Sequence, residues 1–136
     1  MKIAIVSGYF DPLHIGHLDY LEQSKELADM LFVIVNNDKQ AKLKKGKSFM
    51  NEDDRCRIID SLKVVDKVWK SIDTDKTVCK SLIEILEWGY SAEYLFCNGG
   101  DGDIGAEAEV AKKYNVEVVT GLGEKIRSSR NYTGIE

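Results

Sequence analysis

Short apolar runs alternate along the chain with longer segments in which apolar residues recur at helical spacing. The runs cover residues 3–6, 31–35, 94–97 and 116–119, and a less regular one covers residues 66–70. Continuous runs of Val, Ile, Leu and Phe are typical of strands that are buried on both faces of a parallel sheet. Each run therefore predicts a strand.

The segments between these runs predict helices, because apolar residues lie three or four positions apart with charged residues on the other faces. Four helices are expected, over residues 15–28, 51–62, 78–86 and 106–114. Asn51 has the side chain of an N-cap residue, and the acidic residues that follow it suit the positive end of a helix. The alternation of strands and helices predicts a Rossmann-like three-layer α/β sandwich with a mainly parallel five-stranded sheet.

Ligands of such sheets bind beyond the carboxyl ends of the strands. The connections expected at that edge cover residues 7–17, 36–47, 98–105 and 120–130, and they are the most glycine-rich and least hydrophobic stretches of the chain. We therefore expect the functional residues in these four connections.

The composition and charge of the chain exclude several classes of protein. A chain of 136 residues, 43% of them hydrophobic, predicts a single globular domain over residues 1–136. Its formal net charge of -4 argues against a nucleic-acid partner. Because no apolar run approaches the roughly 20 residues that span a bilayer, we expect no membrane partner and a cytoplasmic location. Cys56, Cys79 and Cys97 lie too far apart for a metal-ligand pair and predict reduced thiols.

The connection after the first strand holds the most reactive groups. It reads "GYFDPLHIGHLDYL" and contains the only two histidines of the chain, His14 and His17. Imidazoles at the start of a helix form a compact anion site that suits the phosphates of a nucleotide. The two residues could also be metal ligands, although no third ligand of a catalytic zinc site is evident nearby, or ordinary surface histidines. We favour the phosphate site.

The stretch "GYFDPLHIGHLDYLEQSKELAD", with its core G-x-F-D-x-x-H-x-G-H, resembles the signature of the cytidylyltransferase-like nucleotidyltransferases, above all the glycerol-3-phosphate cytidylyltransferases. The similarity continues through "VNNDKQAKLKKGKSFMNEDDRCRIIDSLKVVDKV" and resumes more loosely at "FCNGGD" and "KIRSSR". It implies an enzyme that moves a nucleoside monophosphate, CMP by preference, from a nucleoside triphosphate to a small phosphorylated alcohol or sugar and releases pyrophosphate. It also implies Mg²⁺ or another divalent cation as cofactor, and a homodimer.

The substrates stay open at this point. The "NGGD" segment also resembles a loop of the sugar-phosphate adenylyltransferases, so the alternative is an adenylyltransferase that uses ATP with a sugar phosphate or a similar acceptor. A non-catalytic nucleotide-binding module is a further alternative, and a flavodoxin-like domain with another phosphate ligand is a third.

The resemblance implies a role for each matching residue. It places four residues in catalysis, namely His14, His17, Lys44 and Ser129. The residues implied in nucleotide binding are Gly8, Tyr9, Phe10, Asp11, His14, His17, Asn98, Gly99, Asp101, Arg127, Ser128 and Ser129. Those implied in binding the acceptor are Asp38, Lys44, Arg55 and Lys63, and Asp11 is the candidate metal ligand.

Each of these roles has a simpler alternative. Lys44 lies in the charged run "KLKKGK", which could be a solvated face, and Arg55 could form a surface ion pair with Glu52 or Asp54. The serine pair at 128–129 could only cap a helix.

Three positions depart from the glycerol-3-phosphate enzymes. Gly46 stands where the family has a second lysine, Leu122 where it has an arginine, and Lys63 where it often has an arginine. Whether Lys47, Arg127 or Arg130 supplies the missing charges stays open at this stage.

Overall fold

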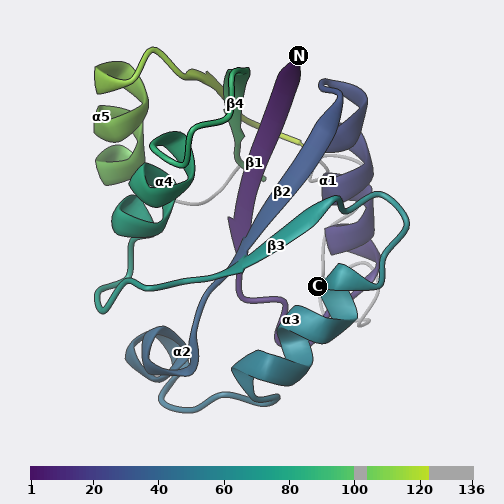
Figure 1. Ribbon diagram of the computed structural model, residues 1–136. Helices are drawn as coiled ribbons and strands as arrows, with labels where there is room; N and C mark the ends of the chain where they lie inside the picture. Colours follow the sequence, from purple (N-terminus) through teal and green to yellow (C-terminus); the bar gives the residue numbers. More distant parts are fainter. Residues whose placement is uncertain (100–103, 123–136) are drawn as a thin grey trace.

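Five strands, each parallel to its neighbours, form one sheet in the order β3-β2-β1-β4-β5. They are β1 (Lys2–Gly8), β2 (Met30–Val35), β3 (Lys67–Lys70), β4 (Glu93–Cys97) and β5 (Glu117–Val119). The computed structural model describes residues 1–99 and 104–122, and it confirms the expected three-layer α/β sandwich (Figure 1).

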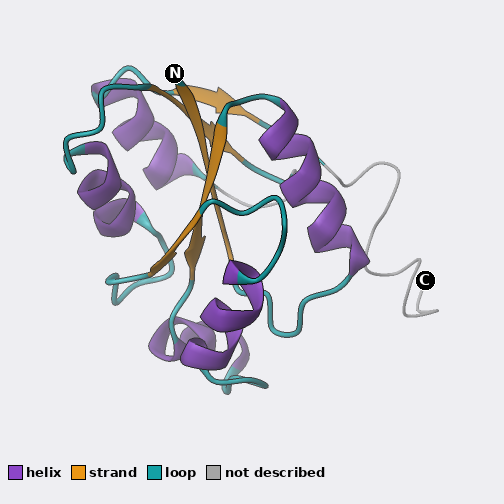
Figure 2. Ribbon diagram, turned by 45° about the vertical axis from the view of Figure 1, so that its right-hand side comes forward, coloured by secondary structure: helices purple, strands orange, loops and turns teal. Residues whose placement is uncertain are grey.

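Helices cover both faces of the sheet (Figures 1 and 2). Those described are α1 (Ile15–Glu26), α2 (Asp38–Lys45), α3 (Glu52–Asp60), α4 (Cys79–Leu86) and α5 (Gly105–Lys113). Because strand side chains alternate between faces, Val6 joins the apolar cluster under α1 and α3, whereas Ile5 joins the cluster under α4 and α5. In the described ranges, none of the helices is long and apolar enough to cross a bilayer.

Helix α2 is an element that the apolar pattern does not predict, since residues 36–47 were expected as a connection. It buries only Gln40 and Ala41, so no apolar stripe marks it. Its start is fixed instead by a capping box, in which the Asn37 side chain accepts from the Gln40 N–H at 2.9 Å and the Gln40 side chain accepts from the Asn37 N–H at 3.0 Å. Helix α2 is therefore defined by these hydrogen bonds at its start and not by apolar residues at helical spacing.

The strand order indicates where along the sheet a ligand would bind. The chain leaves β1 for β2 and β3 on one side and then crosses to β4 on the other side of β1. The carboxyl ends of β1 and β4 therefore meet where the strand order reverses, which is where open α/β sheets bind ligands.

Candidate active site

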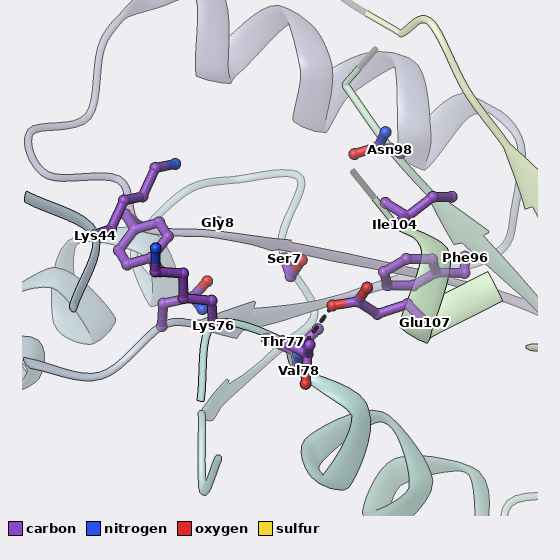
Figure 3. Close-up of a pocket in the computed structure, with 12 residues that line it drawn as sticks. Ser7, Gly8, Lys44, Lys76, Thr77, Val78, Phe96, Asn98, Ile104 and Glu107 are labelled. Atoms are coloured by element: carbon purple, nitrogen blue, oxygen red, sulfur yellow. Dashed lines mark hydrogen bonds between the residues drawn. The ribbon is translucent and has the colours of Figure 1, made fainter. Parts of the chain in front are cut away.

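Two adjoining cavities lie beyond the carboxyl ends of β1 and β4. The histidine cavity has a volume of about 530 Å³ and is lined by Ser7, Gly8, Tyr9, Phe10, Asp11, Pro12, His14, His17, Tyr20, Lys44, Lys45, Asn98 and Gly99. The glutamate cavity (Figure 3) has a volume of about 490 Å³ and is lined by Ser7, Gly8, Tyr9, Asn36, Lys44, Lys76, Thr77, Val78, Phe96, Asn98, Ile104 and Glu107. Because they share five lining residues, they form one site with two compartments.

The two histidines build the first turn of α1. His14 is the N-cap residue, and its Nδ1 accepts a hydrogen bond from the Gly16 N–H at 3.1 Å. His17 reaches back so that its own Nδ1 accepts from the His14 N–H, also at 3.1 Å. The rings stack with their centroids 3.8 Å apart. The pair is therefore a capping box made of imidazoles, and it presents both rings to the histidine cavity.

Both imidazoles are neutral at physiological pH. Burial, and after it the neighbouring His14, lowers the pKa of His17 to about 4, and burial also lowers the pKa of His14. Since each Nδ1 accepts a backbone N–H, the proton of each neutral ring lies on Nε2. The rings therefore offer N–H donors rather than positive charge to an incoming phosphate.

The low pKa of His17 makes the stability of the protein depend on pH. In the unfolded chain an ordinary histidine gains its proton near pH 6.5, whereas in the folded protein His17 resists protonation until about pH 4. Folding stability should therefore fall as the pH drops from 6.5 to 4, by about 3 kcal/mol from this residue alone. His17→Asn keeps an acceptor for the His14 N–H but has no imidazole to protonate. Between pH 7 and pH 4.5, urea unfolding should therefore show a loss of free energy of unfolding that is smaller in His17→Asn than in the original protein by about 2–3 kcal/mol. Equal losses in the two proteins would contradict this prediction.

Gly8 has a packing role beside its expected place at the nucleotide. Phe10 has a φ of 51°, is 2% exposed and packs edge-on against His17 with ring centroids 5.0 Å apart. A Cβ atom on Gly8 would lie 2.7 Å from the Phe10 Cζ atom. Glycine is needed here because the Phe10 ring, which supports His17, occupies the space that a side chain would take.

Asp11 is held by the protein itself. Its carboxylate accepts from the backbone N–H groups of Phe49 and Met50, at 2.8 and 2.7 Å, and from Lys45 Nζ at 3.0 Å. Burial acts to raise its pKa, but these hydrogen bonds outweigh it and hold the pKa below the usual range. Within residues 1–99 and 104–122, no three candidate ligands gather into a metal site. This donor set does not fit a protein-held metal ion at Asp11.

Arg55, expected at the acceptor phosphate, lines neither cavity. Its guanidinium is buried and donates to the carbonyl oxygens of Met50, Tyr9 and Asn36 at 2.9, 2.8 and 2.7 Å, and to Asp38 at 2.7 Å. It therefore joins the connections after β1 and β2 to the segment before α3. A surface ion pair with Glu52 or Asp54 is not what the structure shows.

Two further residues expected at the acceptor lie outside both cavities. The Asp38 carboxylate is paired with Arg55, and although burial acts to raise its pKa, that partner holds the pKa below the usual range. Lys63 is exposed beyond the end of α3. Of the four residues expected to bind the acceptor, the structure brings only Lys44 into the site.

Lys44 stands between the two compartments. It lies in the last turn of α2, lines both cavities, and holds its Nζ atom 4.6 Å from the centre of the Tyr9 ring. The next residues explain a departure from the family pattern. Gly46 ends α2 with a φ of 85°, a conformation that glycine adopts most easily. Lys45, rather than Lys47, lines the histidine cavity.

Some of the remaining residues expected at the site lie among the described residues, and others do not. Asn98 lines both cavities and Gly99 lines the histidine cavity, as expected from their place after β4. Leu122 packs against the core under α1, and its N–H donates to the Asn98 carbonyl at 3.3 Å. Asp101, Arg127, Ser128, Ser129 and Arg130 lie outside the described residues.

The glutamate cavity contains residues that sequence reasoning missed. Lys76, Thr77 and Val78 come from the connection between β3 and α4, Phe96 comes from β4, and Glu107 comes from the first turn of α5. No motif marks them, because their segments read as ordinary loop, strand and helix. The crossovers from β3 to β4 and from β4 to β5 bring these residues together at the site.

Comparison with known proteins assigns the chain to a family. The family described as "Cytidylyltransferase-like" matches residues 5–129, which include both histidines and the lysine-rich helix α2. The chain belongs to this family. The expected membership of the cytidylyltransferase-like family is thus confirmed, whereas the expected likeness to the glycerol-3-phosphate cytidylyltransferases is not shown.

Curated relatives of this cytidylyltransferase-like protein are named FAD synthase. One from Thermoplasma volcanium is 33% identical over 96% of this chain and 83% of its own length, and one from Methanolacinia petrolearia is 33% identical over 96% and 87%. One from Methanocorpusculum labreanum is 44% identical, but that match spans 55% of this chain and 53% of the relative. None of these three names is that of a glycerol-3-phosphate cytidylyltransferase, so the expected preference for CMP is not shown.

Solved structures agree on the fold of the cytidylyltransferase-like chain. The crystal structure of a lipopolysaccharide core biosynthesis protein from Thermoplasma volcanium has a TM-score of 0.73 and 32% identity, covering 88% of this chain and 95% of that one. A bifunctional NMN adenylyltransferase/ADP ribose pyrophosphatase from Francisella tularensis has a TM-score of 0.64 at 12% identity, covering 88% of this chain and 37% of its own, and shows the fold alone.

The expected Mg²⁺ cofactor and the expected homodimer are not tested by these likenesses, and both stay predictions.

Proposed function

We propose that the protein is a FAD synthase, which transfers AMP from ATP to the phosphate of FMN and releases pyrophosphate. The observation that carries the proposal is the divided site. One compartment places neutral imidazoles at a helix start, the other offers apolar walls large enough for a ring system, and Lys44 lines both. The FAD synthase relatives, which align over nearly the whole chain, support the choice of substrates.

The reaction needs alignment more than acid–base chemistry. A phosphate oxygen of FMN attacks the α-phosphorus of ATP in line, and a new P–O bond forms. The bond from the α-phosphorus to the oxygen bridging to the β-phosphate breaks, and its electron pair leaves with pyrophosphate. Because the attacking phosphate is already an anion, no proton has to be removed. The protein has to hold two anions together and stabilise the charge that builds on the α-phosphate.

The described side chains suit those two tasks. In the proposed complex the triphosphate lies in the histidine cavity, where the Nε2–H groups of His14 and His17 donate to oxygens of the α-phosphate. Lys44 contacts the FMN phosphate from the boundary between the compartments and offsets the repulsion between the two reactants. We expect Mg²⁺ to enter with the triphosphate, since the described residues hold no cluster of candidate ligands for it.

The proposal is tested by incubating the purified protein with each pairing of ATP or CTP with FMN or glycerol 3-phosphate, in the presence of MgCl₂. We expect FAD, separated by reversed-phase chromatography and detected by its fluorescence, from ATP and FMN, with one pyrophosphate for each FAD. Formation of CDP-glycerol from CTP and glycerol 3-phosphate, with no FAD, would restore the cytidylyltransferase interpretation. Binding of nucleotide without pyrophosphate release from any pairing would identify a non-catalytic module.

A further inference from the structure

The glutamate cavity is polarised along its length. Figure 3 shows Lys44 and Lys76 at one end and Phe96, Ile104 and Glu107 at the other, with Ser7 between them. A phosphate is attracted to the lysine end and repelled by the carboxylate end. A phosphorylated acceptor should therefore lie with its phosphate near Lys44, beside the histidine cavity, and with its other end near Glu107.

Glu107 is an unusual residue to find at an apolar end. Its side chain is largely buried, with 7% of the residue exposed, and among the described residues it forms no ion pair. Its Oε2 atom accepts a hydrogen bond from the Val78 N–H at 3.0 Å, at the start of α4. An ionised carboxylate has about four acceptor positions, so this single bond leaves it able to accept from a ligand in the cavity.

We propose that Glu107 is a specificity-determining residue that accepts a hydrogen bond from a ring N–H of the acceptor's heterocycle, which lies against Phe96 and Ile104. The inference rests on the proposed FAD synthase activity, because it identifies the ring as the isoalloxazine of FMN. That ring is flat and largely apolar, and its pyrimidine portion has one N–H, at N3. A carboxylate is an acceptor without donors and therefore matches this group.

The test combines one substitution with one altered substrate. In Glu107→Gln a single amide oxygen must serve both the Val78 N–H and the ligand, and the amide NH₂ adds a donor where the ring presents one. 3-Methyl-FMN removes the ring N–H itself. A hydrogen bond to a charged group corresponds to about 10- to 100-fold in a binding constant. We expect Glu107→Gln to raise the KM for FMN by about that factor and to leave the KM for ATP within about twofold.

The effects of Glu107→Gln and of the methyl group of 3-methyl-FMN on kcat/KM should not add. The original protein should use 3-methyl-FMN about 10- to 100-fold less well than FMN in kcat/KM, whereas Glu107→Gln should distinguish the two flavins by less than about threefold, because each change removes the same bond. Glu109→Gln, an exposed substitution on the same helix, is the matched control and should behave as the original protein. Thermal unfolding of all three proteins checks that the fold is retained.

Several outcomes would overturn the inference. The inference would be wrong if Glu107→Gln had an unchanged KM for FMN and still discriminated against 3-methyl-FMN as strongly as the original protein does. If Glu107→Gln raised only the KM for ATP, Glu107 would contact the nucleotide instead. If the original protein makes no FAD, the proposed function fails separately. The inference is then decided by quenching of FMN fluorescence on titration with protein. Weaker binding to Glu107→Gln than to Glu109→Gln would support it, and equal binding or none would overturn it.

Discussion

Replacing His17 with asparagine is expected to lower the turnover number for FAD formation by about 10²- to 10³-fold, the usual cost of losing one hydrogen-bond donor to the developing charge. The Asn side chain can still accept the His14 N–H, as the His17 Nδ1 atom does at 3.1 Å. It does not reach the position of Nε2. The substitution therefore separates the phosphate donor from the helix cap.

His17→Gln is the informative companion, because its longer side chain places an amide N–H near the position of Nε2. Since burial keeps the His17 ring neutral, a neutral amide can replace part of its function, and we expect His17→Gln to retain about tenfold more activity than His17→Asn. Single-turnover rates of FAD formation measure both variants, and urea unfolding at pH 7.5 confirms that each is folded. Near-original turnover in His17→Asn would remove the residue from the mechanism. Equal loss in both variants would indicate that the ring acts in its charged form.

The fold could be predicted largely from the sequence because its strands are buried on both faces. Residues 3–6 and 31–35 leave no polar position, so their apolar runs stand out. The edge strands are shorter and less apolar, and β3 was the least regular of the predicted strands. Helix α2 was missed because hydrogen bonds at Asn37 and Gln40, rather than apolar periodicity, define it. The spacing of an amide three residues after an N-cap asparagine was the available signal.

The candidate site could be predicted only where its chemistry is concentrated in one connection. His14 and His17 were found because rare side chains follow directly on a buried strand. Glu107 could not be found, since the sequence "GAEAEVAKK" gives it the same pattern as the exposed Glu109. Its position depends on the crossover that brings α4 beside α5, a contact between segments far apart in the chain.

Arg55→Met is expected to lower the free energy of unfolding by about 3 kcal/mol, because several acceptors around the buried guanidinium lose their donor at once and each buried acceptor left unpaired costs about 1–3 kcal/mol. The substitution leaves three backbone carbonyls and the Asp38 carboxylate without the donors that now lie 2.7–2.9 Å away. Arg57→Met is the matched control, because Arg57 is exposed on the same helix and should change stability by less than about 0.5 kcal/mol. Urea unfolding at pH 7.5 measures both.

The same residue separates a structural role from a substrate-binding one. If Arg55 acts by joining the connections after β1 and β2, then Arg55→Lys should also be destabilised, because one ammonium group has three donors in place of a planar fork and cannot satisfy all four acceptors. If it binds the acceptor phosphate, Arg55→Lys should keep its stability and raise only the KM for FMN. The guanidinium geometry favours the first result. Unchanged unfolding with a raised KM would return Arg55 to the role that the family resemblance first implied.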